Sequence, residues 1–377
     1  MRLTARQLNR ATLARQMLLR RERAGVVEAF RRVAAVQAQE PASPYIALWN
    51  RVQGFDATEL DRAFAEYAIV KATLMRITLH AVDAADYPAF HEAMQPTLRA
   101  ARMNDRRFTR TGLTKADADA LVPAVLEFAS KPRTNAEAEG WLDARLGVTP
   151  KPGVWWALRQ AGPLVHAPTG GPWSFRPRPS YIAAPRQERS GDITTAQGHL
   201  VRRYLEGFGP ASVHDIAQFG LVGRSMLRDA VQSLGDTLVR LEGPDGKELL
   251  DVPDGTIPSE DSPASPRLLP MWDSVLLAYA DRSRIVPAEY RRVVARSNGD
   301  TLPAVLVDGY VAGVWRPADR GIELTAFLAL DDDAWADLDA EARALVALLA
   351  DREPAVYRRY ARWWGDLPQA AVRIVGG

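Results

Sequence analysis

The sequence predicts a mainly helical α+β protein with a repeated arrangement of elements. A run of helices followed by a two-stranded β-ribbon occurs three times before residue 252, and a β-rich region follows it. The chain has 377 residues, enough for more than one hydrophobic core. We therefore expect units at residues 1–83, 84–192, 193–252 and 253–377.

The first unit shows the pattern within 83 residues. Thr4 suits the N-cap of a first helix, and Asp56 with Glu59 resembles a capping box at the start of a later one. The residues after Tyr67 are instead rich in β-branched side chains, which favour strands. Helices are expected at 4–20, 26–38, 43–52 and 56–67, and strands at 69–75 and 77–82.

The next two units repeat the order of elements without obvious residue identity. In the second unit, helices are expected at 84–102, 115–129, 134–145 and 152–161, strands at 164–167 and 173–175, and an irregular connector at 176–192. In the third, helices are expected at 196–208, 213–217 and 224–234, with Ser212 as an N-cap and a ribbon at 237–241 and 248–252. This is the order of a winged-helix domain, so three tandem winged-helix units forming a concave basic face are predicted.

Residues 253–377 form a different kind of region. A proline-rich linker at 253–266 precedes apolar runs that favour strands, and Asp308-Gly309 is a strong hairpin signal. Strands are expected at 267–272, 275–278, 304–307, 310–316 and 322–328, and helices near 332–350 and 354–364.

Composition restricts the function classes. The chain has no cysteine, which excludes disulfides and thiol chemistry and fits a reducing cytoplasm. No apolar run reaches membrane length, and the histidines, glycines and serines show no metal, phosphate-loop or nucleophile-elbow spacing. We expect a cytoplasmic monomer without a metal or cofactor. Residues 1–112 hold 17 arginines and one lysine against 11 acidic residues, a balance of +7 that suggests a polyanionic partner.

The motif Gln37-Ala38-Gln39 stands out because its first glutamine falls on the apolar stripe of the predicted 26–38 helix. Pro41 ends that helix nearby, and an extended chain at 38–40 would turn both amides to one side. Two converging amides could hold a water molecule, although such a motif is more often only a polar helix end.

A second polar group lies among the predicted C-terminal strands. Asp273 and the run Asp281-Arg282-Ser283-Arg284 fit either a structural Asp–Arg pair or contacts with phosphate groups, and the sequence favours neither. Tandem winged helices make nucleic acid the leading partner. Both a DNA-binding regulator without catalysis and an enzyme acting on DNA remain open on the residues alone.

Four sequence blocks together resemble the AlkZ-like family of winged-helix DNA glycosylases, in its Gln-Φ-Gln branch. The resemblance covers residues 4–365, and Ile77 departs from it because the family has glycine there. The blocks are Val36–Pro41 with Ser43–Trp49, Leu74–His80, Leu269–Asp273 with Asp281–Ser283, and Leu302–Gly309.

The resemblance implies excision of bulky N7-alkylated purines, including crosslinks, from double-stranded DNA, in self-resistance or alkylation repair. It makes Gln37 and Gln39 candidate catalytic residues that position water and sugar. Arg76, His80, Arg282 and Arg284 are candidate DNA-binding residues. Because N7-alkylguanine is positively charged and leaves as a neutral base, the reaction needs no strong general acid. A bulky adduct favours an open concave site over a narrow base-flipping pocket.

Overall fold

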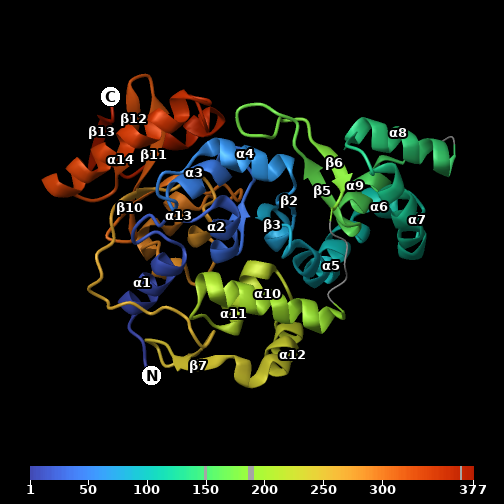
Figure 1. Ribbon diagram of the computed structural model, residues 1–377, viewed down its shortest axis with the longest axis horizontal. Coiled ribbons are helices and arrows are strands. Elements are labelled where there is room, and N and C mark those ends of the chain that lie inside the picture. Colours follow the sequence, from blue (N-terminus) through green and yellow to red (C-terminus); the bar gives the residue numbers. More distant parts are fainter. Residues whose placement is uncertain (148–150, 186–190, 366) are drawn as a thin grey trace.

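The computed structural model describes residues 1–147, 151–185, 191–365 and 367–377 (Figure 1). It is an α+β protein whose described strands form sheets of six, five and two strands. The first elements are α1 (Ala5–Arg15), α2 (Val26–Val33), β1 (Val36–Gln37), α3 (Ser43–Trp49), α4 (Ala57–Ala65), β2 (Ile69–Thr73), the 3₁₀ turn η1 (Met75–Ile77) and β3 (Leu79–Asp83). The expected caps are confirmed, since Thr4 closes a capping box with Gln7 and Asp56 caps α4.

The prediction of one helix over 26–38 is wrong. Helix α2 ends at Val33 because Ala34 has a positive φ of 63° with ψ −51°, which lies outside the helical region. The chain then extends, and β1 pairs with β3 so that Gln37 lies opposite His80. The motif is therefore held by a sheet rather than by a helix end.

The six-stranded sheet continues from the first unit into the second, in the order β1-β3-β2-β5-β6-β4. Its further strands are β4 (Arg133–Thr134), β5 (Leu164–Ala167) and β6 (Ser180–Ala183). Strand β6 lies inside the stretch expected to be irregular, and no strand forms at 173–175. Ser174 has φ 59°, which interrupts an extended chain, and Trp173 and Phe175 instead pack against Tyr45 and Phe64.

A second, smaller hydrophobic core lies on the right of Figure 1. It is formed mainly by helices, and Phe108, Trp155 and Leu158 are among its fully buried residues. The helices of this part are α5 (Tyr87–Met103), α6 (Arg106–Thr109), α7 (Lys115–Phe128), α8 (Asn135–Leu146) and α9 (Pro152–Ala161).

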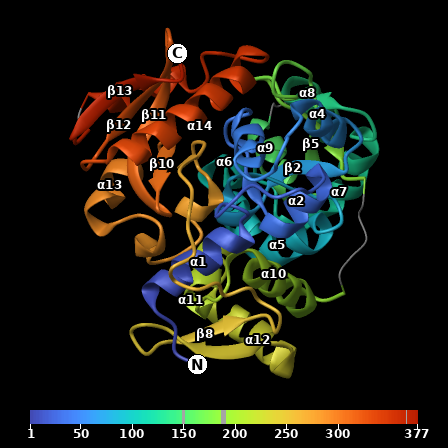
Figure 2. The same cartoon turned by 60° about the vertical axis from the view of Figure 1, so that its left-hand side comes forward.

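The third unit matches its prediction closely. It contains α10 (Ile193–Phe208), α11 (Val213–Gly220), α12 (Arg224–Leu234), the turn η2 (Gly235–Thr237), and the hairpin β7 (Val239–Glu242) and β8 (Glu248–Asp251). Ser212 forms the expected capping box with Asp215. Figure 2 shows this unit beneath the rest of the molecule, where the buried Arg15–Asp251 ion pair joins α1 to β8.

The C-terminal region is built on the five-stranded sheet β13-β12-β11-β10-β9. Its elements are β9 (Arg267–Leu268), η3 (Ser274–Leu276), η4 (Arg282–Arg284), η5 (Ala288–Tyr290), α13 (Arg291–Val294), β10 (Ala304–Val307), β11 (Tyr310–Ala318), β12 (Gly321–Ala326), α14 (Asp332–Ala350), η6 (Arg358–Trp364) and β13 (Ala371–Val375). The hairpin prediction is confirmed: Asp308 and Gly309 both have positive φ, as a tight turn between twisted strands requires.

Two expectations for this region are wrong. Residues 275–278 form no strand, because Asp273 accepts a hydrogen bond from the Val275 amide and caps the 3₁₀ turn η3. The stretch 354–364 contains the 3₁₀ segment η6 rather than an α-helix, and Tyr357 precedes it in a left-handed conformation. A short buried apolar run does not reveal its backbone type by periodicity.

Candidate active site at Gln37 and Gln39

Gln37 is a nearly buried amide with a charged partner. Its side chain is 3% exposed, and its Oε1 accepts a hydrogen bond of 2.7 Å from Arg76 Nη2. Nε2 of Gln37 has no hydrogen-bond partner within the described ranges, and it is not among the fully enclosed unpaired atoms there. The amide nitrogen is therefore the group that Gln37 keeps free.

Arg76 reaches Gln37 from the turn between β2 and β3. Arg76 and Ile77 both have left-handed backbones, with φ 55° and 57°. Glycine, the residue expected at position 77 from the resemblance, would adopt this conformation without steric cost, whereas Ile77 adopts it with strain. The Arg76 guanidinium lies 5.0 Å from the centre of the Phe219 ring, and burial lowers the pKa of Arg76 to about 10.

His80 lies behind Arg76 and is fully buried. Its Nδ1 is 3.1 Å from the Thr78 carbonyl oxygen, and its Nε2 is 3.3 Å from Arg76 Nη2. A carbonyl only accepts, so Nδ1 carries the proton and Nε2 accepts from Arg76. Burial, and then the charge of Arg76, lower the pKa of His80 to about 3, which keeps the ring neutral.

Gln39 is exposed beside this buried group. The Ala38 amide donates to the Leu79 carbonyl at 2.7 Å, and the Leu79 amide approaches Gln39 Oε1 at 3.4 Å. The hydrogen bonds between β1 and β3 thus continue past Gln37, and the side-chain carbonyl of Gln39 lies next to the backbone of β3. The side chain of Gln37 is therefore buried, whereas that of Gln39 faces solvent.

The C-terminal segment supports the motif from the other side. Glu40 forms an ion pair with Arg359 and accepts a hydrogen bond of 2.8 Å from the Tyr360 hydroxyl. The Tyr357 hydroxyl lies 3.0 Å from Ser43 Oγ at the start of α3. These partners are about 320 residues away in sequence, and no local signal could have identified them.

The polar residues at the starts of η3 and η4 have different environments. Asp273 forms a bidentate ion pair with Arg51, with both N–O distances 2.8 Å and both side chains 1% exposed. The structural Asp–Arg pair therefore exists, but its arginine comes from the end of α3. Asp281 accepts from the Ser283 amide and caps η4.

Arg284 and Arg282 also differ. Arg284 Nη1 donates to the Pro210 carbonyl at 2.9 Å, and its guanidinium lies 4.0 Å from the centre of the Tyr279 ring. The side chain of Arg282 has no hydrogen-bond or ion-pair partner among the residues that the structure places. Burial and the charge of Arg291 lower the pKa of Arg282, and Arg282 in turn helps to lower that of Arg76. The charge of Arg282 therefore acts on Arg76, the residue that contacts Gln37.

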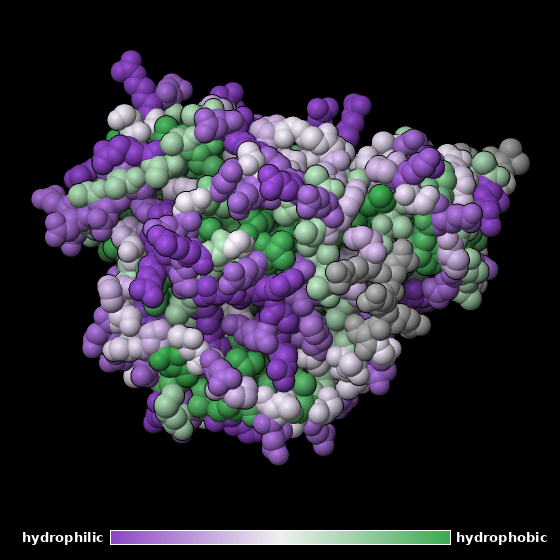
Figure 3. Space-filling model, viewed as in Figure 1, coloured by the Kyte–Doolittle hydropathy of each residue, from purple (hydrophilic) through white to green (hydrophobic). Residues whose placement is uncertain are grey.

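DNA contacts of Arg76, His80, Arg282 and Arg284 stay predictions. Arg282 is the one whose environment is directly suited to an anion. Hydrophilic side chains gather over α2 and α10 in Figure 3, and Arg31 and Arg203 are among the charged residues of these helices.

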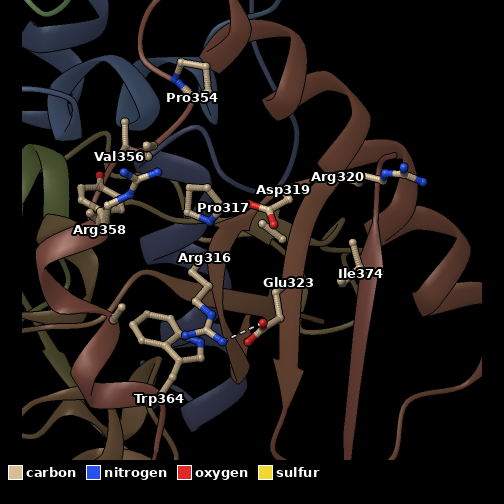
Figure 4. Close-up of a pocket in the computed structure, with 14 residues that line it drawn as sticks. Arg316, Pro317, Asp319, Arg320, Glu323, Pro354, Val356, Arg358, Trp364 and Ile374 are labelled. Carbon is tan, nitrogen blue, oxygen red and sulfur yellow. Dashed lines mark hydrogen bonds and ion pairs between the residues drawn. The ribbon is translucent and has the colours of Figure 1, made fainter.

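A cavity of about 800 Å³ lies apart from this site, beside the five-stranded sheet and η6 (Figure 4). Its lining includes Arg316, which pairs with Glu323 at 2.8 Å and approaches the Trp364 ring. None of the candidate site residues lines it. The described parts of the chain contain no group of three or more metal-binding side chains and no helix long and apolar enough to cross a membrane.

Comparison with known proteins identifies the family. The family model for AlkZ-like DNA glycosylases matches residues 30–348. A curated relative, the interstrand DNA cross-link repair glycosylase of Streptomyces sahachiroi, is 24% identical over 341 residues, 85% of this chain and 90% of the relative. The solved structure of Streptomyces sahachiroi DNA glycosylase AlkZ has a TM-score of 0.77 at 22% identity, covering 94% of this chain and 99% of that one. The family model spans most of the chain and the fold is shared, so the chain belongs to the AlkZ-like family of DNA glycosylases.

Proposed function

We propose that this glycosylase excises bulky N7-alkylated purines from double-stranded DNA by hydrolysis of the N-glycosidic bond. The observation that carries the proposal is the pair of amides at Gln37 and Gln39, one fixed by Arg76 and the other exposed. In this reaction the water oxygen bonds to C1′, and the C1′–N9 electrons pass to the purine. The alkylated purine leaves as a neutral base, and a water proton passes to solvent.

Glutamine suits this reaction because the leaving group is already activated. An amide is too weak a base to deprotonate water near pH 7, but it positions water through its carbonyl and its amide hydrogens. The positive charge of the N7-alkylated base supplies the activation that other leaving groups need from an acid. Crosslinked purines are included in the proposal because the curated relative is an interstrand DNA cross-link repair glycosylase. Self-resistance or alkylation repair is the proposed biological role.

The proposal includes a DNA-binding architecture of three tandem winged-helix units that present a concave face, without a metal or cofactor. The helices α10, α11 and α12 followed by the β7–β8 hairpin support this interpretation for the third unit. We propose that the enzyme acts as a monomer in the cytoplasm. Arg282 is proposed as a phosphate contact because it is a partly buried cation with no acidic partner in the described chain.

Excision assays on duplex DNA containing N7-alkylguanine test the proposal. The wild-type protein should produce abasic sites, and Gln37→Ala and Gln39→Ala should each lower the single-turnover rate by about 10²- to 10⁴-fold, the usual effect of a positioned polar group. DNA affinity should change little. Gln53→Ala is the matched control, because Gln53 is exposed and lies outside the site.

The alternative for Gln37 is a purely structural amide. In that case Gln37→Ala would lower the free energy of unfolding by about 1–3 kcal/mol through its unpaired partner and leave excision per folded molecule intact. Wild-type rates in both alanine variants would remove the catalytic assignment of the motif.

A further inference from the structure

We propose that Arg76 is a positioning residue that fixes the donor and acceptor roles of the two glutamines. It holds the Gln37 carbonyl, so Gln37 presents its amide hydrogens to the reacting water and Gln39 presents its carbonyl. The inference rests on the proposed function and assigns Arg76 a task other than contact with DNA.

The orientation of the Gln37 amide follows from the chemistry of its partner. A guanidinium group only donates hydrogen bonds, so the Gln37 atom 2.7 Å from Arg76 Nη2 is the carbonyl oxygen. A flipped amide would place two donors against each other inside a buried site, leaving both unpaired. The direction of the Gln37 amide is therefore set by Arg76 and not by packing alone.

Arg76 is itself fixed by a chain of hydrogen bonds. His80 donates from Nδ1 to the Thr78 carbonyl and accepts at Nε2 from Arg76 Nη2. The two hydrogens of Nη2 are thus used once each, for His80 and for Gln37. Because the ring stays neutral, Nε2 keeps the lone pair that this arrangement requires.

The position of Arg76 includes features that cost free energy. The residue has a left-handed backbone, its Nη1 is buried without a partner, and it forms no ion pair with any described residue. A guanidinium that served packing alone would not need these features. Contacts with Gln37, His80 and Phe219 account for its orientation.

The opposite roles of the amides define the position of the water molecule. The water oxygen accepts from Gln37 Nε2 and donates one hydrogen to Gln39 Oε1, which keeps a free lone pair beside its long contact with the Leu79 amide. One lone pair of the water remains for C1′. The water proton leaves to solvent because neither amide is basic enough to keep it.

Glutamate substitutions test the assigned roles. Gln37→Glu keeps the bond to Arg76 but replaces the free donor by an acceptor, and single-turnover excision should fall by at least about 100-fold with thermal stability retained. Gln39→Glu keeps an acceptor at its position and should lose at least tenfold less than Gln37→Glu. Equal losses, or a larger loss in Gln39→Glu, would overturn the assignment.

A double-mutant cycle tests whether Arg76 affects excision through Gln37. Arg76→Met should lower excision about as much as Gln37→Ala, and adding it to Gln37→Ala should cause no further loss. Duplex affinity should hold in Arg76→Met and fall in Arg282→Met. Arg76→Lys, which keeps the charge and one donor, should recover part of the rate and covers the case in which Arg76→Met folds poorly.

The outcomes separate the inference from the proposed function. If the wild-type protein forms no abasic sites, the proposed function fails, and if Gln37→Ala excises at the wild-type rate, Gln37 has no catalytic role and Arg76 cannot act through it. If Gln37→Ala is defective but Arg76→Met is active, or if their losses multiply, only the positioning role of Arg76 fails. If DNA binding is weaker both in Arg76→Met and in the double variant with Gln37→Ala, Arg76 is a DNA contact instead.

Discussion

Removing Asp273 should destabilise the fold strongly and leave the chemistry intact. Arg51 and Asp273 are both 1% exposed and share two bonds of 2.8 Å. Without the carboxylate, Arg51 keeps only the Ala47 carbonyl at 3.0 Å and Gln16 Oε1 at 3.3 Å. Breaking a buried pair in this way costs about 3–5 kcal/mol. The lost cap on the Val275 amide adds about 1 kcal/mol.

Urea unfolding of Asp273→Ala and of Arg51→Met/Asp273→Leu measures this effect. The single variant should lose about 4–6 kcal/mol, a large share of the 5–15 kcal/mol typical of folded domains. The double variant should recover most of the loss, because it removes both buried charges together. Excision per folded molecule should match the wild type in both. An Asp273→Ala protein of wild-type stability with impaired DNA binding would refute the structural assignment of this residue.

Three further predictions follow from the site. Ile77→Gly should be more stable than Ile77→Ala by about 1 kcal/mol in urea unfolding, reversing the usual order, because alanine is strained at φ 57°; equal stabilities would contradict the left-handed turn. The free energy of unfolding should fall as pH drops from about 6.5 towards 3, by up to about 1.4 kcal/mol per pH unit for His80, because the unfolded chain takes up a proton there and the folded chain does not. His80→Gln should make that fall shallower, and an unchanged slope would argue against a neutral buried ring. DNA affinity should decrease as the salt concentration rises. Arg282→Ala should reduce the slope of log affinity against log salt concentration by about one ion. Arg284→Ala should instead lower thermal stability. A salt-independent affinity would remove the phosphate-contact account.

Local chemistry made much of the fold predictable from the sequence. The caps at Thr4, Asp56 and Ser212 depend on side chains three or fewer residues from the amides they bind. The Asp308-Gly309 hairpin likewise depends on two residues that tolerate positive φ. Such signals are complete within a few residues, and the helices that they cap begin where expected, although α1 ends at Arg15 rather than near residue 20.

The environment of the Gln-Ala-Gln motif could not be predicted in the same way. Its apolar stripe favoured a helix to residue 38, whereas the positive φ of Ala34 ends the helix and pairing of Gln37 with His80 places the motif in a strand. The partnership of Arg51 with Asp273 depends on residues 222 positions apart. The sequence pointed to the two amides as candidates, but tertiary pairing decides which of their atoms are free.

Because Arg359 and Tyr360 contact Glu40, the order in which the chain is synthesised determines when the motif gains its full set of contacts. Glu40 is synthesised about 320 residues before Arg359 and Tyr360, the residues that support it. A nascent or prematurely terminated polypeptide that stops before Tyr357 carries both glutamines without that support. The motif therefore gains these contacts only after translation has passed Tyr360. A fragment that ends earlier has the same two glutamines but lacks the contacts.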